Sequence, residues 1–182
     1  SDLSDFSALT PGTWTVDPSH SHIGFVVRHL MVAKVRGTFN EFTGTITVPE
    51  NPLEASLVAE VQMASIDTKD AGRDGHLKTG DFFEVETYPT MTLRSTSIEE
   101  NGGDLVLHGD LTIKGITHPV AFDLEFDGVA QDPYGNTKAG FSATGEINRK
   151  DFGIEWNMVL ETGGIALGEK VKIEIEIEAV KG

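Results

Sequence analysis

The chain has 182 residues, of which 38% are hydrophobic and 24% are charged, a composition typical of one globular domain. Its formal net charge of −15 disfavours nucleic acid and electrostatic adsorption to anionic lipid, because both partners are themselves negative. The longest uninterrupted apolar run, residues 30–33, is far shorter than the about 18 residues that a membrane-spanning helix needs.

Two further features of the chain bear on chemistry and location. There is no cysteine, which excludes disulfides, thiol catalysis and cysteine-based zinc sites. Residues 1–10 are acidic and polar rather than a signal peptide, so we expect a cytoplasmic location. The first residue is not methionine, which leaves processing of the N-terminus open.

The predicted secondary structure consists almost wholly of strands, in which apolar and polar residues alternate with a period of two. Such runs lie at residues 20–27, 53–63, 91–95, 105–113, 120–126, 139–143 and 171–179. Turn residues separate them at 48–52, 101–103, 114–115 and 132–136. About eight strands with short connections indicate an all-β fold, an antiparallel eight-stranded barrel. A two-sheet sandwich is the alternative that this pattern leaves open.

Two segments depart from the strand pattern. Residues 68–79 predict a short helix with Asp67 or Thr68 as its N-cap, although Gly72 and Gly75 weaken it. Residues 153–168 are apolar but aperiodic. We expect this second segment to pack across one end of the barrel or to gate it.

Small residues recur on the faces that the alternation turns inward. They are Ala55, Ala59, Gly109, Ala139, Ala143 and Ala179. Such residues either interdigitate with large side chains or leave a channel, and the pattern by itself does not choose between the two.

Several stretches in combination resemble the YceI-like family. Residues 14–30, WTVDPSHSHIGFVVRHL, are similar to the opening of that family, with Val35, Gly37 and Phe39 following. The other matching stretches are residues 65–68, 73–77, 81–83, 88–89, 109–120, 151–153 and 171–179. The resemblance covers about residues 13–180, so we expect an N-terminal extension at 1–12 and one barrel domain at 13–182.

The resemblance implies an extended eight-stranded barrel of lipocalin type with one or two short helices. It also implies an apolar tunnel that takes polyisoprenoid chains, including isoprenoid quinones. Many members of the family carry a signal peptide and act in the periplasm, and this chain shows none. The bound lipid or quinone is the only cofactor-like molecule that the resemblance suggests.

Strand parity assigns a set of mostly apolar side chains to the inside of the barrel, where they would contact the ligand. These candidates are Phe25, Val27, His29, Phe39, Phe42, Leu57, Val61, Met91, Leu93, Phe122, Leu124, Phe141 and Trp156. A slip of one residue near a β-bulge would reverse the assignment locally.

The histidines admit a functional and a structural interpretation. His20 and His22, two residues apart, could hold a metal, but no ligand cluster of known spacing accompanies them, so we expect no metal site. His29 has inward parity and would either donate a hydrogen bond to a ligand headgroup or cap the barrel. Arg28 has the opposite parity and should face outward or pair with a carboxylate.

Residues 73–77, RDGHL, place an acid and an imidazole close together, which suggests catalysis. No nucleophile elbow, phosphate loop or paired-carboxylate motif accompanies them. We therefore favour a helix docked across a barrel opening, with Phe82 and Phe83 buried, and name no catalytic residue.

The favoured function is non-enzymatic binding, storage or transport of a long apolar isoprenoid ligand, with that small molecule as the partner. The first alternative is an enzyme acting on a hydrophobic small molecule, with His29 or His76 as acid or base. The second is a closed barrel that acts on a protein partner through its acidic surface. The sequence leaves open whether the chain is a monomer or a homodimer.

Overall fold

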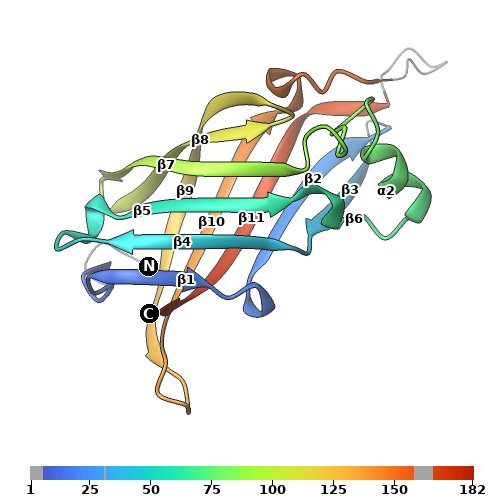
Figure 1. Ribbon diagram of the computed structural model, residues 1–182. Helices are drawn as coiled ribbons and strands as arrows, with labels where there is room; N and C mark the ends of the chain where they lie inside the picture. The colour runs from blue at the N-terminus through green and yellow to red at the C-terminus, as the bar shows by residue number, and fades with distance from the viewer. Residues whose placement is uncertain (1–5, 31, 158–165) are drawn as a thin grey trace.

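The computed structural model describes residues 6–30, 32–157 and 166–182 and shows an antiparallel β-barrel with one α-helix at its side (Figure 1). The strands are β1 (Gly12–Val16), β2 (His22–His29), β3 (Ala33–Phe39), β4 (Phe42–Val48), β5 (Ser56–Gln62), β6 (Ile66–Asp67), β7 (Thr90–Asn101), β8 (Asp104–Ile113), β9 (Ile116–Gln131), β10 (Thr137–Asn148) and β11 (Leu167–Lys181). The helices are α2 (Ala71–Leu77) and the 3-10 turns η1 (Pro18–His20), η2 (Pro52–Glu54), η3 (Met63–Ser65) and η4 (Arg149–Phe152).

Strand β1 closes the barrel because it pairs on both of its edges. Trp14 lies opposite Ile46 of β4 on one side and opposite Lys181 of β11 on the other. The sheet therefore runs from β1 through β4, β5, β7, β8, β9, β10 and β11 and back to β1. The prediction of an all-β, eight-stranded antiparallel barrel is confirmed, and the sandwich alternative is wrong.

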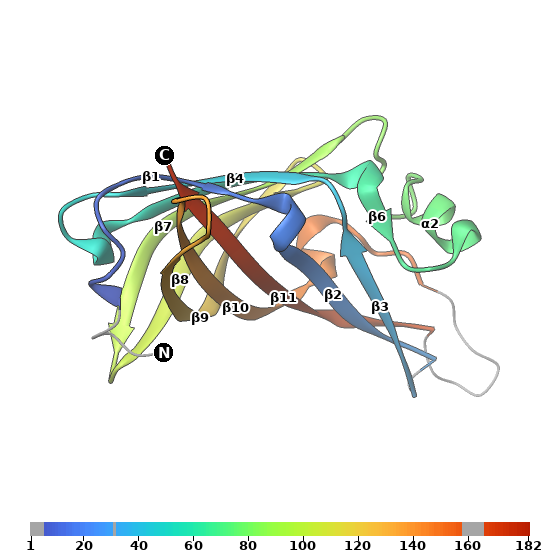
Figure 2. The same cartoon turned by 90° about the horizontal axis from the view of Figure 1, so that it is seen from below.

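At the other end of the barrel, β11 changes partner. Its first half pairs with β2, Val171 lying opposite Val27, and β2 pairs in turn with β3. The outer edge of β3 pairs with β6 only at Thr38 and Phe39. Helix α2 lies beside β6 at this end, as Figures 1 and 2 show. The two ends of the barrel are thus built differently, and only the end at β1 is closed by a complete ring of strands.

Helix α2 is shorter than the sequence indicated and begins later. It covers Ala71–Leu77, with Asp70 as the N-cap, whose carboxylate accepts from the amide of Arg73 at 3.0 Å. The two residues predicted as N-caps do not cap the helix and make other hydrogen bonds. The carboxylate of Asp67 accepts from the amide of Lys69, which adopts a left-handed φ of 65°. Thr68 donates its hydroxyl and its amide to Asp74. The chain therefore turns once more before the helix starts.

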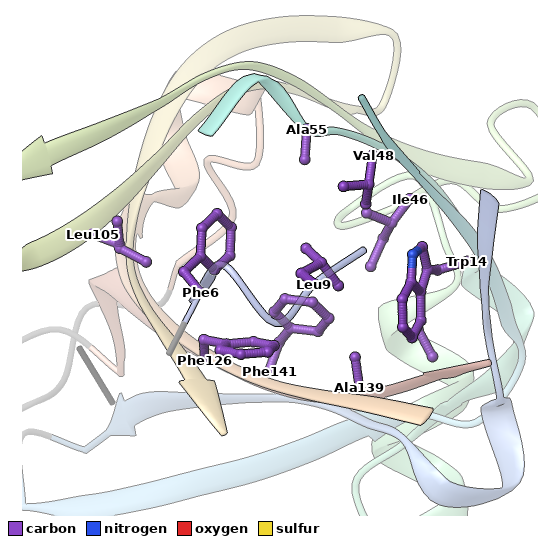
Figure 3. Packing of buried hydrophobic residues seen from close by; sticks show 11 residues of the cluster. Phe6, Leu9, Trp14, Ile46, Val48, Ala55, Leu105, Phe126, Ala139 and Phe141 are labelled. Atoms are coloured by element: carbon purple, nitrogen blue, oxygen red, sulfur yellow. The ribbon is translucent and has the colours of Figure 1, made fainter. Parts of the chain in front are cut away.

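The closed end is filled by residues that precede β1. Phe6 and Leu9, from the predicted N-terminal extension, are 2% and 1% exposed and lie inside the ring of strands (Figure 3). The ring of Phe6 meets Phe126 edge-on, with ring centroids 5.5 Å apart. Trp14 completes this cluster and donates its indole N–H to the carbonyl of Thr10. Phe6 and Leu9 of the predicted extension therefore belong to the core of the barrel.

The small inward residues are used mainly for packing at this closed end. Ala139 and Ala179 lie directly opposite each other on β10 and β11 and are almost fully buried. Both belong to the same cluster as Trp14, Phe126 and Phe141. Ala139 and Ala179 thus make room for large rings, whereas Ala55 and Ala143 line a small void in the barrel interior.

Candidate ligand-binding cavity

A cavity of about 510 Å³ lies at the α2 end of the barrel interior. Its walls come from β2, β3, β7, β8, β10 and β11, from α2 and η4, and from Leu30, Phe82, Phe83, Ile154, Trp156 and Ala166 in the connecting segments. The volume falls in the range of roughly 300–1,000 Å³ that is usual for small-molecule sites. In the described part of the chain its lining holds no carboxylate and no hydroxyl group, and the polar side chains are His29, Arg73, His76 and Arg149.

Six of the side chains predicted to contact a ligand line this cavity. They are Phe25, Val27, His29, Phe39, Met91 and Trp156. On β2 the alternation places every second residue, from Ile23 to His29, on the cavity side. His29 thus points inward, as its parity indicated, and lies at the end of its strand.

A smaller void of about 70 Å³ follows farther along the barrel, toward the closed end. Four other predicted positions line it: Leu57, Leu93, Leu124 and Phe141. The two spaces are successive, because Met91 and Leu93 are neighbouring inward positions on β7, as are Ile173 and Ile175 on β11. Phe6 and Leu9 also line the smaller void and so limit its depth.

The remaining three predicted positions, Phe42, Val61 and Phe122, are buried and line neither space. Phe42 and Val61 pack with Phe39 and Met63 in one cluster. Phe122 is 1% exposed and packs beside Phe152 in another. A ligand contact at any of the thirteen positions stays a prediction, and for these three it would require the packing to open.

Several lining residues were missed by the sequence reasoning. They are Ile23, Gly24, Leu30, Val35, Gly72, Arg73, His76, Leu77, Phe82, Phe83, Ile113, Ile147, Arg149, Phe152, Ile154, Ala166, Leu167, Val171 and Ile173. The alternation of β11 already indicated Val171 and Ile173. Ile23 belongs to the predicted run at residues 20–27, and Val35 lies within β3, which no predicted run covered. Most of the others come from α2, from turns and from strand ends, where strand parity carries no information. Residues 158–165 of the expected apolar loop lie outside the described residues.

Helix α2 turns one face to the cavity. Arg73, His76 and Leu77, at positions i, i+3 and i+4, line it together. The ring of His76 stands edge-on to Phe82 at 5.0 Å and to Trp156 at 5.1 Å, centroid to centroid. Its Nε2 atom lies 2.8 Å from Oδ2 of Asp81. This arrangement confirms the helix as part of the barrel cover, with Phe82 buried and Phe83 half-buried beneath it.

Arg149 fixes the backbone of the segments that border the cavity after β10 and at the start of β11. The residue is 4% exposed, and its guanidinium donates to the carbonyls of Ile154, Trp156, Leu167 and Gly168 at 2.8–3.2 Å. Burial lowers the pKa of Arg149 from its ordinary value, and the negative charge of Glu169 partly opposes that shift. Because its N–H groups are used in this way, Arg149 positions Trp156 and is poorly placed to hold an anionic headgroup.

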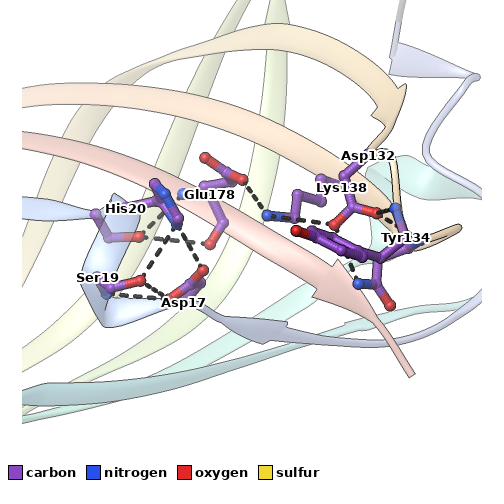
Figure 4. Close-up of polar contacts among 9 residues, drawn as sticks. Asp17, Ser19, His20, Asp132, Tyr134, Lys138 and Glu178 are labelled. Carbon is purple, nitrogen blue, oxygen red and sulfur yellow. Dashed lines mark hydrogen bonds and ion pairs between the residues drawn. The ribbon is translucent and has the colours of Figure 1, made fainter.

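The histidine pair considered for a metal is divided between two elements. His20 ends η1 and His22 begins β2, so they do not share a strand face. His20 instead bonds through Nδ1 to Asp17 at 2.8 Å, close to Glu178 (Figure 4). Glu178 is ion-paired with Lys138 at 3.0 Å. This network joins η1 to β11 on the outside of the barrel, away from the cavity.

A closed antiparallel barrel of eight strands with an apolar space inside defines a lipocalin-like protein. Residues 14–179 match the family model described as YceI-like domain, and the chain belongs to this family. In the part of the chain that the structure describes, no helix is long and apolar enough to cross a membrane.

Similar proteins cover almost the whole chain. UPF0312 protein SA2479 of Staphylococcus aureus strain N315 is 42% identical over 167 residues, 91% of this chain and 95% of that protein. Among solved structures, the Campylobacter jejuni YCEI protein has a TM-score of 0.70 at 30% identity, covering 85% of this chain and 90% of that one. Burkholderia cenocepacia BcnA has a TM-score of 0.75 at 24% identity, covering 90% and 98%.

One further similar structure is described by the class of ligand that it binds. It is a polyisoprenoid binding domain from Saccharophagus degradans, with a TM-score of 0.68 at 16% identity, covering 93% of this chain and 98% of that one. At this identity the likeness shows a shared fold.

Proposed function

We propose that this protein binds a long apolar molecule of the isoprenoid class in the 510 Å³ cavity and carries or stores it without changing it chemically. The observation that carries the proposal is the composition of the cavity wall, which is apolar apart from four side chains. Membership of the YceI-like family and the polyisoprenoid-binding description of one structural neighbour support the isoprenoid class.

Burial of the chain accounts for affinity without an ionic contact. Removing one isoprene unit from water contributes up to roughly 4 kcal/mol, at about 0.8 kcal/mol for each carbon. Lost motion of the ligand offsets a large share of this gain. A ligand with several units can therefore bind tightly to walls such as those formed by Phe25, Phe39 and Ile173.

The few polar groups at the cavity suit an oxygen-bearing headgroup. Arg73 donates to the hydroxyl and the carbonyl of Thr68, which fixes its guanidinium at the cavity wall. His29 and His76 each offer a ring N–H or an acceptor nitrogen there, depending on tautomer. A quinone carbonyl or a phosphate oxygen would match these donors, so we include isoprenoid quinones in the proposed class.

The enzyme alternative depends on one observation, the contact between His76 and Asp81. A carboxylate in this position orients an imidazole for proton transfer. The described lining offers no nucleophile and no second carboxylate to work with it, and the pair is partly exposed to solvent. We therefore favour binding over catalysis at this cavity.

The test of the proposed function is ligand extraction followed by rebinding. Mass spectrometry of an organic extract of freshly purified protein should show a prenyl compound. Titration of the stripped protein with prenyl alcohols should change the fluorescence of Trp156, which lines the cavity, and Trp156→Phe should remove that change. Absence of both signals would exclude the function.

Matched variants on β11 locate the binding event. Ile173 faces the cavity and Lys172 faces outward on the same strand. Ile173→Trp should fill part of the cavity and lower prenyl affinity at least tenfold, while Lys172→Trp should leave it unchanged. Equal affinities in the two variants would show that the ligand binds elsewhere.

A further inference from the structure

The hairpin formed by β2 and β3 carries a cluster of cations on its outer face. Arg28, Lys34 and Arg36 are all exposed there. Arg28 lies directly opposite Lys34, and Arg36 lies opposite Val26 in the next row on the same face. From residue 18 to residue 40 the sequence contains no aspartate or glutamate. The hairpin is thus locally basic in a protein with 29 acidic and 14 basic residues.

This arrangement costs the free protein stability. Two like charges directly opposite each other on neighbouring strands repel. Within the described ranges, none of these three cations forms an ion pair, although carboxylates outnumber cations by about two to one in the chain. Unpaired cations held side by side favour an anionic partner that lies outside the chain.

The tip of the same hairpin exposes apolar side chains. Leu30 is 44% exposed and Val32 is 84% exposed, and the two lie close together at the tip. The amide of Leu30 bonds to the carbonyl of Ala166 at 2.7 Å, which anchors the tip to the rim of the cavity. Leu30 also belongs to the lining of the cavity. Apolar side chains between cations are the combination that binds at the interface of an anionic bilayer.

The hairpin lies far from the carboxylates at the opposite end of the molecule. It lies at the end of the molecule opposite the chain termini (Figure 2). Strand β9 alone has 16 residues. At about 3.3 Å per residue, such a strand is several times longer than the screening length of roughly 8 Å at physiological salt. Carboxylates at the far end therefore contribute little at the tip and disfavour any other orientation.

We propose that the β2–β3 hairpin docks this protein on the surface of an anionic lipid bilayer, with Leu30 and Val32 entering the interface and Arg28, Lys34 and Arg36 against the lipid phosphates. Docking in this orientation brings the strands that line the cavity to the membrane, where an apolar ligand enters or leaves. Apart from Leu30, the residues of the docking surface lie outside the cavity lining, so docking can be tested without any bound ligand.

The chain offers a matched control site for this surface. Val58 is 43% exposed, almost the same as Leu30, and lies directly opposite the exposed Arg94 on β5 and β7. Unlike Arg36, Arg94 has a carboxylate opposite it on its other side, Asp110 of β8. Like the hairpin surface, this pair combines an exposed cation with an exposed apolar side chain, but it lies elsewhere on the barrel.

The experiment is sedimentation of the stripped protein with vesicles of phosphatidylcholine alone or of equal parts phosphatidylcholine and phosphatidylglycerol. We expect binding to the anionic vesicles only, and a loss of roughly fivefold in affinity for each of Lys34→Gln and Arg36→Gln. Leu30→Ser combined with Val32→Ser should also weaken binding. Arg94→Gln and Val58→Ser should leave it unchanged.

Two results would overturn the proposal: no binding to anionic vesicles, or equal losses in Arg36→Gln and Arg94→Gln. Near-ultraviolet circular dichroism of each variant checks that the fold is retained. Ile173→Trp separates this proposal from the proposed function, because it should lose prenyl binding and keep vesicle binding.

Discussion

The ring of Phe122 on β9 lies so close to the backbone of Gly145 on β10 that a Cβ atom at residue 145 would come within 2.6 Å of Cδ1 of Phe122. Gly145 stands between Ala143, which lines the smaller void, and Ile147, which lines the cavity. The glycine therefore lets the ring pack between the two spaces. This contact explains why Phe122 is core and not cavity wall, despite its inward parity.

Gly145→Ala is expected to destabilise the protein by about 1–3 kcal/mol, because the added methyl group overpacks a site with no free volume. Urea denaturation followed by circular dichroism measures the change. Gly75→Ala is the control, since a Cβ at residue 75 of α2 meets no atom within 4 Å. That variant should be stabilised by about 0.5–1 kcal/mol through helix propensity. Equal effects in the two variants would contradict the packing argument.

Phe6→Ala should cost about 3–5 kcal/mol, although the residue lies outside the family match, because its ring is buried against Phe126. The same substitution enlarges the smaller void that Phe6 lines. The variant should therefore accept longer prenyl alcohols than the unmodified protein. Tyr134→Ala, at a side chain that is 90% exposed, should change neither property. Chemical denaturation and chain-length titrations give the two readouts.

Arg149→Met should lower the free energy of unfolding by at least about 3 kcal/mol, since four backbone carbonyls lose their donor. The substitution also releases the carbonyl of Trp156, so the near-ultraviolet signal of that indole should weaken. Lys150→Met removes a neighbouring exposed cation and serves as the control. A loss below 1 kcal/mol in Arg149→Met would show that water replaces the arginine without cost.

Asp17 makes stability depend on pH in the acid range. Hydrogen bonds from His20 and Ser19 lower the pKa of Asp17 from 3.8 to about 2. Since the folded-state pKa is depressed, the contribution of the carboxylate is complete above pH 4 and is lost as the pH falls toward 2. Asp17→Asn should therefore be less stable than the unmodified protein at pH 5, and the difference should shrink by pH 2. A difference that stays constant over this range would refute the account.

The sequence was sufficient to predict the strands, the faces they turn inward and the antiparallel barrel. Strict alternation in residues 171–179 determines which side chains are buried, because a strand turns successive residues to opposite faces. The same parity placed Phe25, Val27 and His29 correctly on the cavity side of β2. For α2, the predicted N-cap, Asp67 or Thr68, was wrong, since Asp67 caps a turn and Asp70 caps the helix.

Parity alone does not distinguish an inward side chain that packs from one that faces a space. That difference depends on what other parts of the chain contribute: Phe6 and Leu9 fill the end at β1, and Phe122 packs against Gly145 between the two spaces. Only the tertiary structure brings Arg149 to the carbonyls of Ile154, Trp156, Leu167 and Gly168, and only it places Arg28 opposite Lys34. The sequence by itself determined the barrel, because alternation is local, whereas the cavity depends on contacts between distant segments.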